Sequence, residues 1–151
     1  MSAVISDCQR YRYWLERDRG ERPLVFVMLN PSTADAGVDD PTIRRCRRFA
    51  SDNGYTGIIV VNLYAFRSAS PAVLFAADEP VGAENDAFLL KASKMGDVCL
   101  AWGANAKPSR VVSVMDIIRK SGNAPLCLGK TKNDSPRHPL YVKADQMLVE
   151  F

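Results

Sequence analysis

The sequence contains few of the residues that build metal sites and disulfide bridges. Its four cysteines lie far apart without a C-x-x-C pair, and it has one histidine. A structural zinc site therefore has too few ligands at a usable spacing. Cys99 and Cys127 lie in apolar runs, which predicts buried thiols. A signal peptide and a long apolar segment are also lacking, so we expect a cytoplasmic protein with no membrane span.

Three loop motifs that mark common enzyme classes are missing as well. The sequence has no G-x-x-x-x-G-K-S/T phosphate loop, no G-x-G-x-x-G after an apolar run and no G-x-S-x-G turn. We therefore expect no nucleotide cofactor and no metal. The charge excess is also small, with 20 basic and 17 acidic residues. This weak bias fits nucleic acid, nucleotides or no charged partner.

The sequence does contain the composition of an ordinary globular protein. Of its 151 residues, 47% are hydrophobic and 25% are charged. A chain of this length buries roughly 70% of its unfolded surface, so it can form a stable core without disulfide bridges or bound metal ions. It has no linker or repeat, which predicts a single domain over residues 1–151.

Apolar runs alternate with helical patterns along the chain. The runs predict strands at residues 10–17, 24–29, 57–63, 97–103 and 125–129. Helical spacing predicts one helix from Asp40-Pro41 to Asn53-Gly54, and others at 71–77, 85–95 and 107–120. We expect the first two strands to form a hairpin. The alternation predicts a three-layer α/β/α sandwich around a mainly parallel four-stranded sheet, with an antiparallel N-terminal strand.

Polar residues follow the predicted parallel strands where each strand ends. They are Asn30 with Pro31 and Ser32, Asn62, Trp102 with Gly103, and the loop after Gly129 that carries Arg137 and His138. Because the carboxyl ends of parallel strands share one edge of the sheet, we expect a substrate site there. The substrate contacts expected from it are Asn62, Pro31, Ser32, Trp102 and Gly103.

Three residues in this set could take part in binding or catalysis, and each also has a purely structural interpretation. Asn30 can orient a water molecule, or it can be a turn residue before proline. Asn62 can read an amide edge, or it can cap the strand end. His138 can act as a general acid or electrostatic stabiliser, or it can be an exposed loop residue.

Charged residues on the first predicted helix allow two interpretations. The guanidinium groups of Arg44, Arg45 and Arg48, together with Arg137, match phosphate oxygens. The helix arginines can equally form a solvated face. Similarly, the carboxylates at 35, 39 and 40 can bind Mg²⁺, but a capping role for Asp40 makes a metal site the weaker interpretation.

Four segments resemble motifs of the uracil-DNA glycosylase superfamily, in the same order. VFVMLNPS (Val25–Ser32) resembles the strand that ends at the water-positioning residue, and GIIVVNLYAF (Gly57–Phe66) resembles the strand whose terminal Asn reads the flipped base. CLAWGANA (Cys99–Ala106) is similar to a Trp-Gly strand end, and RHPLYV (Arg137–Val142) to the His-Pro loop. The chain also resembles a bacterial family of unknown function through LNPSTAD, DDPTIRRC and NLYAFR.

The resemblance implies a uracil-DNA-glycosylase-like fold and hydrolysis of an N-glycosidic bond in DNA, a nucleoside or a nucleotide. It implies that Asn30 positions the water, Asn62 reads the base and His138 stabilises the departing base. Tyr141 stands where the His-Pro loop of that superfamily carries small residues, which raises the question whether it fills the pocket.

Two other functions fit the same sequence. The chain can be a non-catalytic module that binds a nucleotide or nucleic acid through the helix arginines and Arg137. It can also be an interaction protein whose N-terminal strand, with Tyr11, Tyr13 and Trp14, pairs with a partner. The sequence does not specify an oligomeric state.

Overall fold

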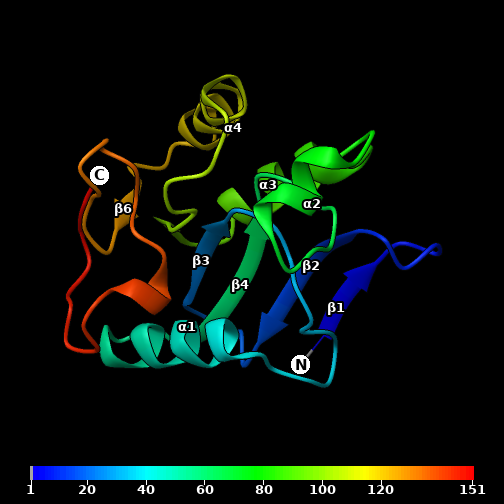
Figure 1. The fold of residues 1–151 in the computed structure, drawn as a ribbon. Helices are drawn as coiled ribbons and strands as arrows, with labels where there is room; N and C mark the ends of the chain where they lie inside the picture. The colour runs from blue at the N-terminus through cyan, green and yellow to red at the C-terminus, as the bar shows by residue number, and fades with distance from the viewer. Residues whose placement is uncertain (1) are drawn as a thin grey trace.

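A seven-stranded mixed sheet forms the centre of the computed structural model, which describes residues 2–151 (Figure 1). The strand order is β1-β2-β4-β3-β5-β6-β7, and the four strands β4, β3, β5 and β6 are mutually parallel. The other three strands pair antiparallel with their neighbours. The bounds are β1 Ser2–Ile5, β2 Arg12–Arg17, β3 Pro23–Met28, β4 Gly57–Asn62, β5 Asp97–Leu100, β6 Leu126–Cys127 and β7 Val149–Glu150. The predicted α/β class is confirmed.

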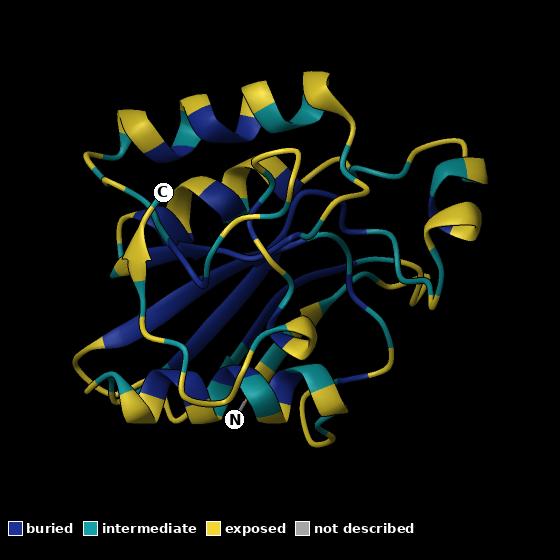
Figure 2. Cartoon of the chain, turned by 60° about the vertical axis from the view of Figure 1, so that its left-hand side comes forward, coloured by how far each residue is buried: buried dark blue, intermediate teal, exposed yellow. Residues whose placement is uncertain are grey.

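Helices cover both faces of this sheet (Figure 2). One face packs against α1 (Pro41–Asp52), and the other packs against α3 (Asn85–Ser93) and α4 (Pro108–Lys120), with the short α2 (Pro71–Ala76) beside them. A single 3₁₀ turn, η1 (Pro139–Tyr141), follows the loop that carries His138. Within residues 2–151, none of the helices combines the length and the apolar character that crossing a bilayer requires.

Strand β3 is central because both of its faces are apolar. All six of its residues are buried. Phe26 belongs to the core cluster under α1, while Val25 and Val27 belong to the cluster under α3 and α4. A strand with parallel neighbours on both sides and helices on both faces has no solvated face, which explains the unbroken apolar run.

Helix α1 follows local signals that are visible in the sequence. Asp40 caps it, since its carboxylate oxygen Oδ1 accepts a hydrogen bond of 2.9 Å from the backbone N–H of Ile43. Pro41 occupies the first turn, where no hydrogen-bond donor is needed. The predicted cap and helix start are therefore confirmed.

The predicted N-terminal hairpin is wrong. Strand β2 pairs with β4 rather than with β3, and β1 pairs with the outer side of β2. The turn between β2 and β3 crosses the start of β4, where a Cβ atom on Gly57 would lie 1.9 Å from the carbonyl oxygen of Asp18. A glycine at this position allows β4 to lie between two strands that are consecutive in sequence.

The two ends of the sheet also differ from the sequence prediction. Strand β1 and strand β7 were not predicted, and the tail from Lys130 contains η1 and β7. The expected strand at 125–129 has only two paired residues, in β6. Edge strands are short and half-exposed, so their sequences lack the apolar runs that mark the inner strands.

Candidate functional site

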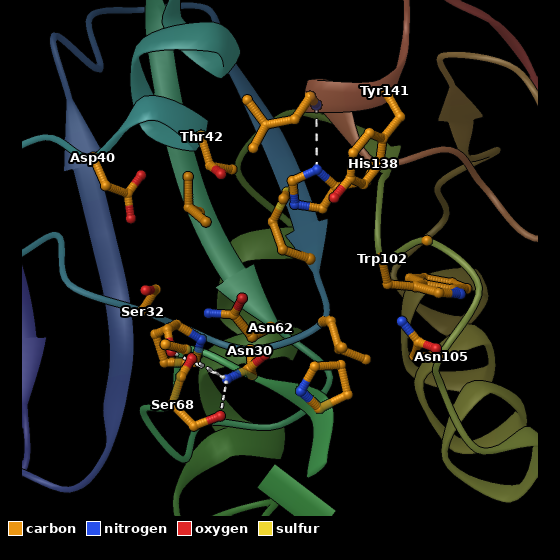
Figure 3. Close-up of a pocket in the computed structure, with 18 of the residues that line it drawn as sticks. Asn30, Ser32, Asp40, Thr42, Asn62, Ser68, Trp102, Asn105, His138 and Tyr141 are labelled. Carbon is orange, nitrogen blue, oxygen red and sulfur yellow. Dashed lines mark hydrogen bonds between the residues drawn. The ribbon is translucent and has the colours of Figure 1, made fainter. Parts of the chain in front are cut away.

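A pocket of about 430 Å³ lies at the carboxyl ends of β3, β4 and β5. The N-terminal turn of α1 and the loop before η1 form its other walls (Figure 3). Eight residues predicted from the sequence line it: Asn30, Pro31, Ser32, Asn62, Trp102, Gly103, Arg137 and His138. The structure therefore brings together strand ends that are far apart in the sequence.

Asn62 forms part of the pocket floor and has an unpartnered amide. The residue is 2% exposed, and its Nδ2 atom is buried without a hydrogen-bond partner in the described part of the chain. It follows Val60 on the face of β4 that packs under α1, where a polar residue is unusual. Asn85 fixes the backbone here, donating from Nδ2 to the carbonyl oxygens of Asn62 (2.9 Å) and Leu63 (3.1 Å). The side-chain amide is thus held in place without being used by the fold.

Asn30 has one occupied end and one free end. Its Nδ2 donates to the carbonyl oxygens of Pro31, Phe66 and Ser68 at 3.0–3.3 Å and to the Ser68 hydroxyl at 3.2 Å. Carbonyl oxygens only accept, which fixes the orientation of the amide. Its Oδ1 accepts no hydrogen bond within residues 2–151 and is the group left for a ligand or water. Figure 3 shows Asn30 directly beside Asn62.

His138 presents a hydrogen-bond donor to the pocket. The backbone N–H of Leu140 donates to its Nδ1 at 3.2 Å. In the neutral ring the proton therefore lies on Nε2, which makes no hydrogen bond in the described residues. Burial lowers the pKa of His138, and the nearby Asp40 carboxylate opposes this effect only in part. The imidazole is accordingly neutral near pH 7.

The loop that carries His138 is attached to the strand ends. Gly103 donates its backbone N–H to the carbonyl oxygen of Pro136 at 2.8 Å, and Arg137 donates to that of Gly129 at 2.9 Å. Gly103 has φ +77, a left-handed conformation that favours glycine. The ring of Trp102 belongs to the core cluster under α4 and extends away from Asn62 (Figure 3). Trp102 therefore supports the wall from behind.

Tyr141 lies at the rim and leaves the pocket open. Its side chain is 78% exposed, and its ring lies 5.6 Å from that of His138, centroid to centroid. The backbone N–H of Tyr141 also donates to the carbonyl oxygen of His138. The bulky residue in this loop thus stands beside the catalytic candidate rather than inside the cavity.

The three helix arginines predicted to bind phosphate do not line the pocket. Arg44 donates to the backbone carbonyl of Asp39, Arg45 donates to that of Val142, and Arg48 pairs with Asp52 one turn along the helix. Of the four predicted phosphate contacts, only Arg137 is a lining residue. Each of the three helix arginines thus has a partner within the described chain.

The aspartates considered as metal ligands also have hydrogen-bond or ion-pair partners in the protein. The Asp35 carboxylate accepts two backbone hydrogen bonds from its own turn, and Asp40 caps α1. Asp39 pairs with Arg17 and Arg47, both at 2.7 Å. Within residues 2–151, the acidic, histidine and cysteine side chains form no group of three or more that could hold a metal ion.

Arg12 is a lining residue that the sequence interpretation missed. It is 2% exposed, and its Nη1 donates to the carbonyl oxygen of Ala34 at 2.9 Å. Its Nε is buried without a partner in the described chain. The segment RYRYWLER was interpreted only as a strand for pairing. The signal available there was an arginine at each end of an otherwise buried strand.

Comparisons with known proteins identify a family but no activity. A family model described as "Protein of unknown function (DUF1643)" matches residues 10–140. No curated protein and no solved structure matches the chain. The matched range includes every pocket residue from Arg12 to Leu140. The chain therefore belongs to the DUF1643 family.

Proposed function

We propose that the pocket binds a nucleobase and that the protein hydrolyses the N-glycosidic bond between this base and its sugar. The observation that carries the proposal is the unpartnered amide of Asn62 on the pocket floor. A buried polar group without a partner destabilises the folded state by about 1–3 kcal/mol. A ligand with complementary donors and acceptors, such as the edge of a nucleobase, removes this penalty.

The free end of Asn30 supports the hydrolytic step. Its Oδ1 can accept a hydrogen bond from a water molecule and direct that water toward the C1′ atom of the sugar. The C1′–N bond then breaks, and the base leaves with the bonding electrons. Water supplies a hydroxyl group to C1′ and a proton to the base. An amide is not a charged base, so the reaction relies on positioning more than on proton abstraction.

The Nε2–H group of His138 supports the departure of the base. A neutral imidazole can donate a hydrogen bond to the oxygen on which negative charge develops as the bond breaks. His138 lines the same pocket as both asparagines, on the side opposite Asp40 and Ser32 (Figure 3). The resemblance of these strand ends to the uracil-DNA glycosylase superfamily agrees with the three roles.

Base release measured by chromatography tests this proposal. The substrates are nucleosides, nucleoside monophosphates, and oligonucleotides that contain uracil or a mismatch. We expect release with at least one class, and a loss of about 10²-fold or more for Asn62→Leu and His138→Ala. Absence of release from every class would contradict the hydrolytic proposal. Binding of the same compounds without release would instead support a binding module.

Asn62→Leu carries its own structural control. Replacing an unpartnered amide with an apolar group of similar size should leave stability unchanged or raise it, by up to about 1–3 kcal/mol. Urea denaturation measures this difference. A destabilised variant would show that the amide serves the fold, which would remove the main support for base recognition.

A further inference from the structure

The pocket contains a buried positive charge that base recognition does not use. Arg12 lies at the start of β2 and is 2% exposed. Of its guanidinium nitrogens, only Nη1 makes a hydrogen bond within residues 2–151, to the carbonyl oxygen of Ala34. Its Nε is buried and unpartnered. The Nε–Nη2 edge, which can bind two oxygens at once, is therefore unused by the fold.

The other arginine of this strand shows how a structural guanidinium is satisfied in the same protein. Arg17 is fully buried, and its Nε pairs with the Asp39 carboxylate at 2.7 Å. Its Nη atoms donate to four backbone carbonyls, those of Ser2, Glu16, Asp35 and Val38. Arg12, by contrast, forms no ion pair in the described residues. Of the two buried arginines of β2, only Arg12, which lines the pocket, has an unpartnered Nε within the described residues.

The charged groups around Arg12 do not neutralise its positive charge. Burial lowers the pKa of Arg12 to about 10, the Asp40 carboxylate acts in the opposite direction, and Arg67 and Arg17 add to the lowering. The guanidinium therefore remains charged at neutral pH, among other cations. A buried charge without a paired counter-charge is unfavourable, and an anionic ligand relieves this.

We propose that Arg12 binds the phosphate group of a mononucleotide through its Nε–Nη2 edge. The proposal rests on the proposed function, because it names the substrate of that site as a nucleotide rather than a nucleoside. Thr42 and Ser32 place hydroxyl groups on the same pocket.

The burial of Arg12 favours a free nucleotide over a nucleic acid. A phosphodiester within a strand continues in two directions and needs an open channel on both sides. A terminal phosphate ends the ligand and can reach a side chain that is 2% exposed. A cavity of about 430 Å³ is also in the size range of small-molecule sites.

A substitution of Asp40 should change phosphate affinity in the direction opposite to a substitution of Arg12. Its carboxylate lines the pocket and repels an anion bound near Arg12. Asparagine is as good a helix cap as aspartate, so Asp40→Asn removes the charge and keeps the cap. We expect Asp40→Asn to bind phosphate more tightly than the wild-type chain, and Arg12→Gln to bind it more weakly.

The experiment is calorimetric titration with inorganic phosphate, a nucleoside and its 5′-monophosphate, at constant ionic strength. We expect the monophosphate to bind about tenfold or more tightly than the nucleoside, and Arg12→Gln to abolish this difference. Arg119→Gln is the matched control, because it removes an exposed arginine that does not line the pocket. Arg12→Lys keeps the charge without the two-donor edge and should recover only part of the affinity.

The outcomes separate this inference from the proposed reaction. Monophosphate binding that depends on Arg12, with no base release, supports the inference and contradicts the hydrolysis. Base release from nucleosides and nucleotides at equal rates, unchanged in Arg12→Gln, contradicts the inference alone. Tighter binding of a single-stranded oligonucleotide than of the mononucleotide would also overturn it. If Arg12→Gln does not fold, unchanged phosphate affinity in Asp40→Asn overturns it.

Discussion

At the residue scale, Asn62 and Arg12 share a property that few buried polar side chains have. Both are 2% exposed, and each has a buried nitrogen without a partner among residues 2–151. Most buried polar groups in proteins are hydrogen-bonded, so unpartnered ones on a pocket wall indicate places for a ligand. One supplies an amide and the other a cation, which is the combination that a nucleotide would use.

His138 is the residue whose ionisation can be followed directly. Because it is the only histidine in the sequence, its ring resonances in an NMR titration are unambiguous. We expect a midpoint below the ordinary value of 6.5, since burial lowers its pKa. Protonation places a hydrogen on Nδ1, which can then no longer accept the hydrogen bond from the Leu140 N–H that orients the ring. Base release should therefore fall over the same pH interval as the pH decreases.

The lowered pKa of His138 also makes the free energy of unfolding depend on pH. A histidine with a lowered pKa binds its proton less tightly in the folded state than in the unfolded chain. Its contribution to the free energy of unfolding is fully present above pH 6.5 and is lost as the pH falls through the lowered pKa. His138→Ala should lack this pH dependence in urea denaturation. A midpoint at or above 6.5 would contradict the neutral-donor role.

At the element scale, Asn30 joins the end of β3 to the segment that leads into α2. Its Nδ2 bonds to residues 66 and 68 as well as to Pro31, so a side chain on one strand end fixes a loop from another. A turn residue was the plain alternative for Asn30 in the sequence. The structure shows that the Nδ2 end of the amide serves the fold, while Oδ1 has no partner within the described residues.

Asn30→Asp should therefore harm the protein, although aspartate is the stronger base. A carboxylate cannot donate to the carbonyl oxygens that now share the two N–H groups of Nδ2, and it faces them with negative charge. We expect a loss of about 1–3 kcal/mol in the free energy of unfolding, measured in urea, and lower activity. Asn105→Asp is the control, as an exposed asparagine on the same pocket whose side chain makes no hydrogen bond in the described chain. Equal stabilities of the two variants would contradict the joining role.

At the scale of the whole molecule, one ion-pair network connects β2, the loop after β3 and α1. Asp39 pairs with the fully buried Arg17 and with Arg47, which also pairs with Asp18. Burial alone would raise the pKa of Asp39, but hydrogen bonds and charge from Arg17 and Arg47 outweigh it and lower the pKa. The network holds the loop that contains Ala34, the partner of Arg12.

Asp39→Asn should destabilise the fold strongly, because it leaves Arg17 buried without a counter-charge. We expect about 3 kcal/mol, the lower end of the range for breaking a buried pair, since Asp39 is partly exposed. Asp18→Asn, which breaks an exposed pair, should cost about 1 kcal/mol or less. Because the pKa of Asp39 lies below 3.8, the gap between wild type and Asp39→Asn should shrink only as the pH falls below that value. Urea denaturation from pH 7 to pH 3 measures both effects, and a gap that stays constant would contradict the ionic origin.

The sequence by itself determined the elements that depend on neighbours along the chain. Asp40 and Pro41 specify the start of α1, and Ile43, Cys46, Phe49 and Ala50 mark its buried face, because capping and helical periodicity act within a few residues. The apolar runs of β3 and β4 likewise predict inner strands. Parallel inner strands place their carboxyl ends at one edge, so eight lining residues of the pocket could be predicted.

Only the tertiary structure decided which of these residues have partners. The pairing of β2 with β4, the partners of the helix arginines and the exposure of Arg12 to the pocket join residues that are far apart in sequence. No local pattern records such contacts, because a side chain's hydrogen bonds depend on which distant backbone lies beside it. Arg12 and Arg17 belong to the same strand and are both buried, yet the fold satisfies the Nε of Arg17 and leaves that of Arg12 without a partner in the described chain.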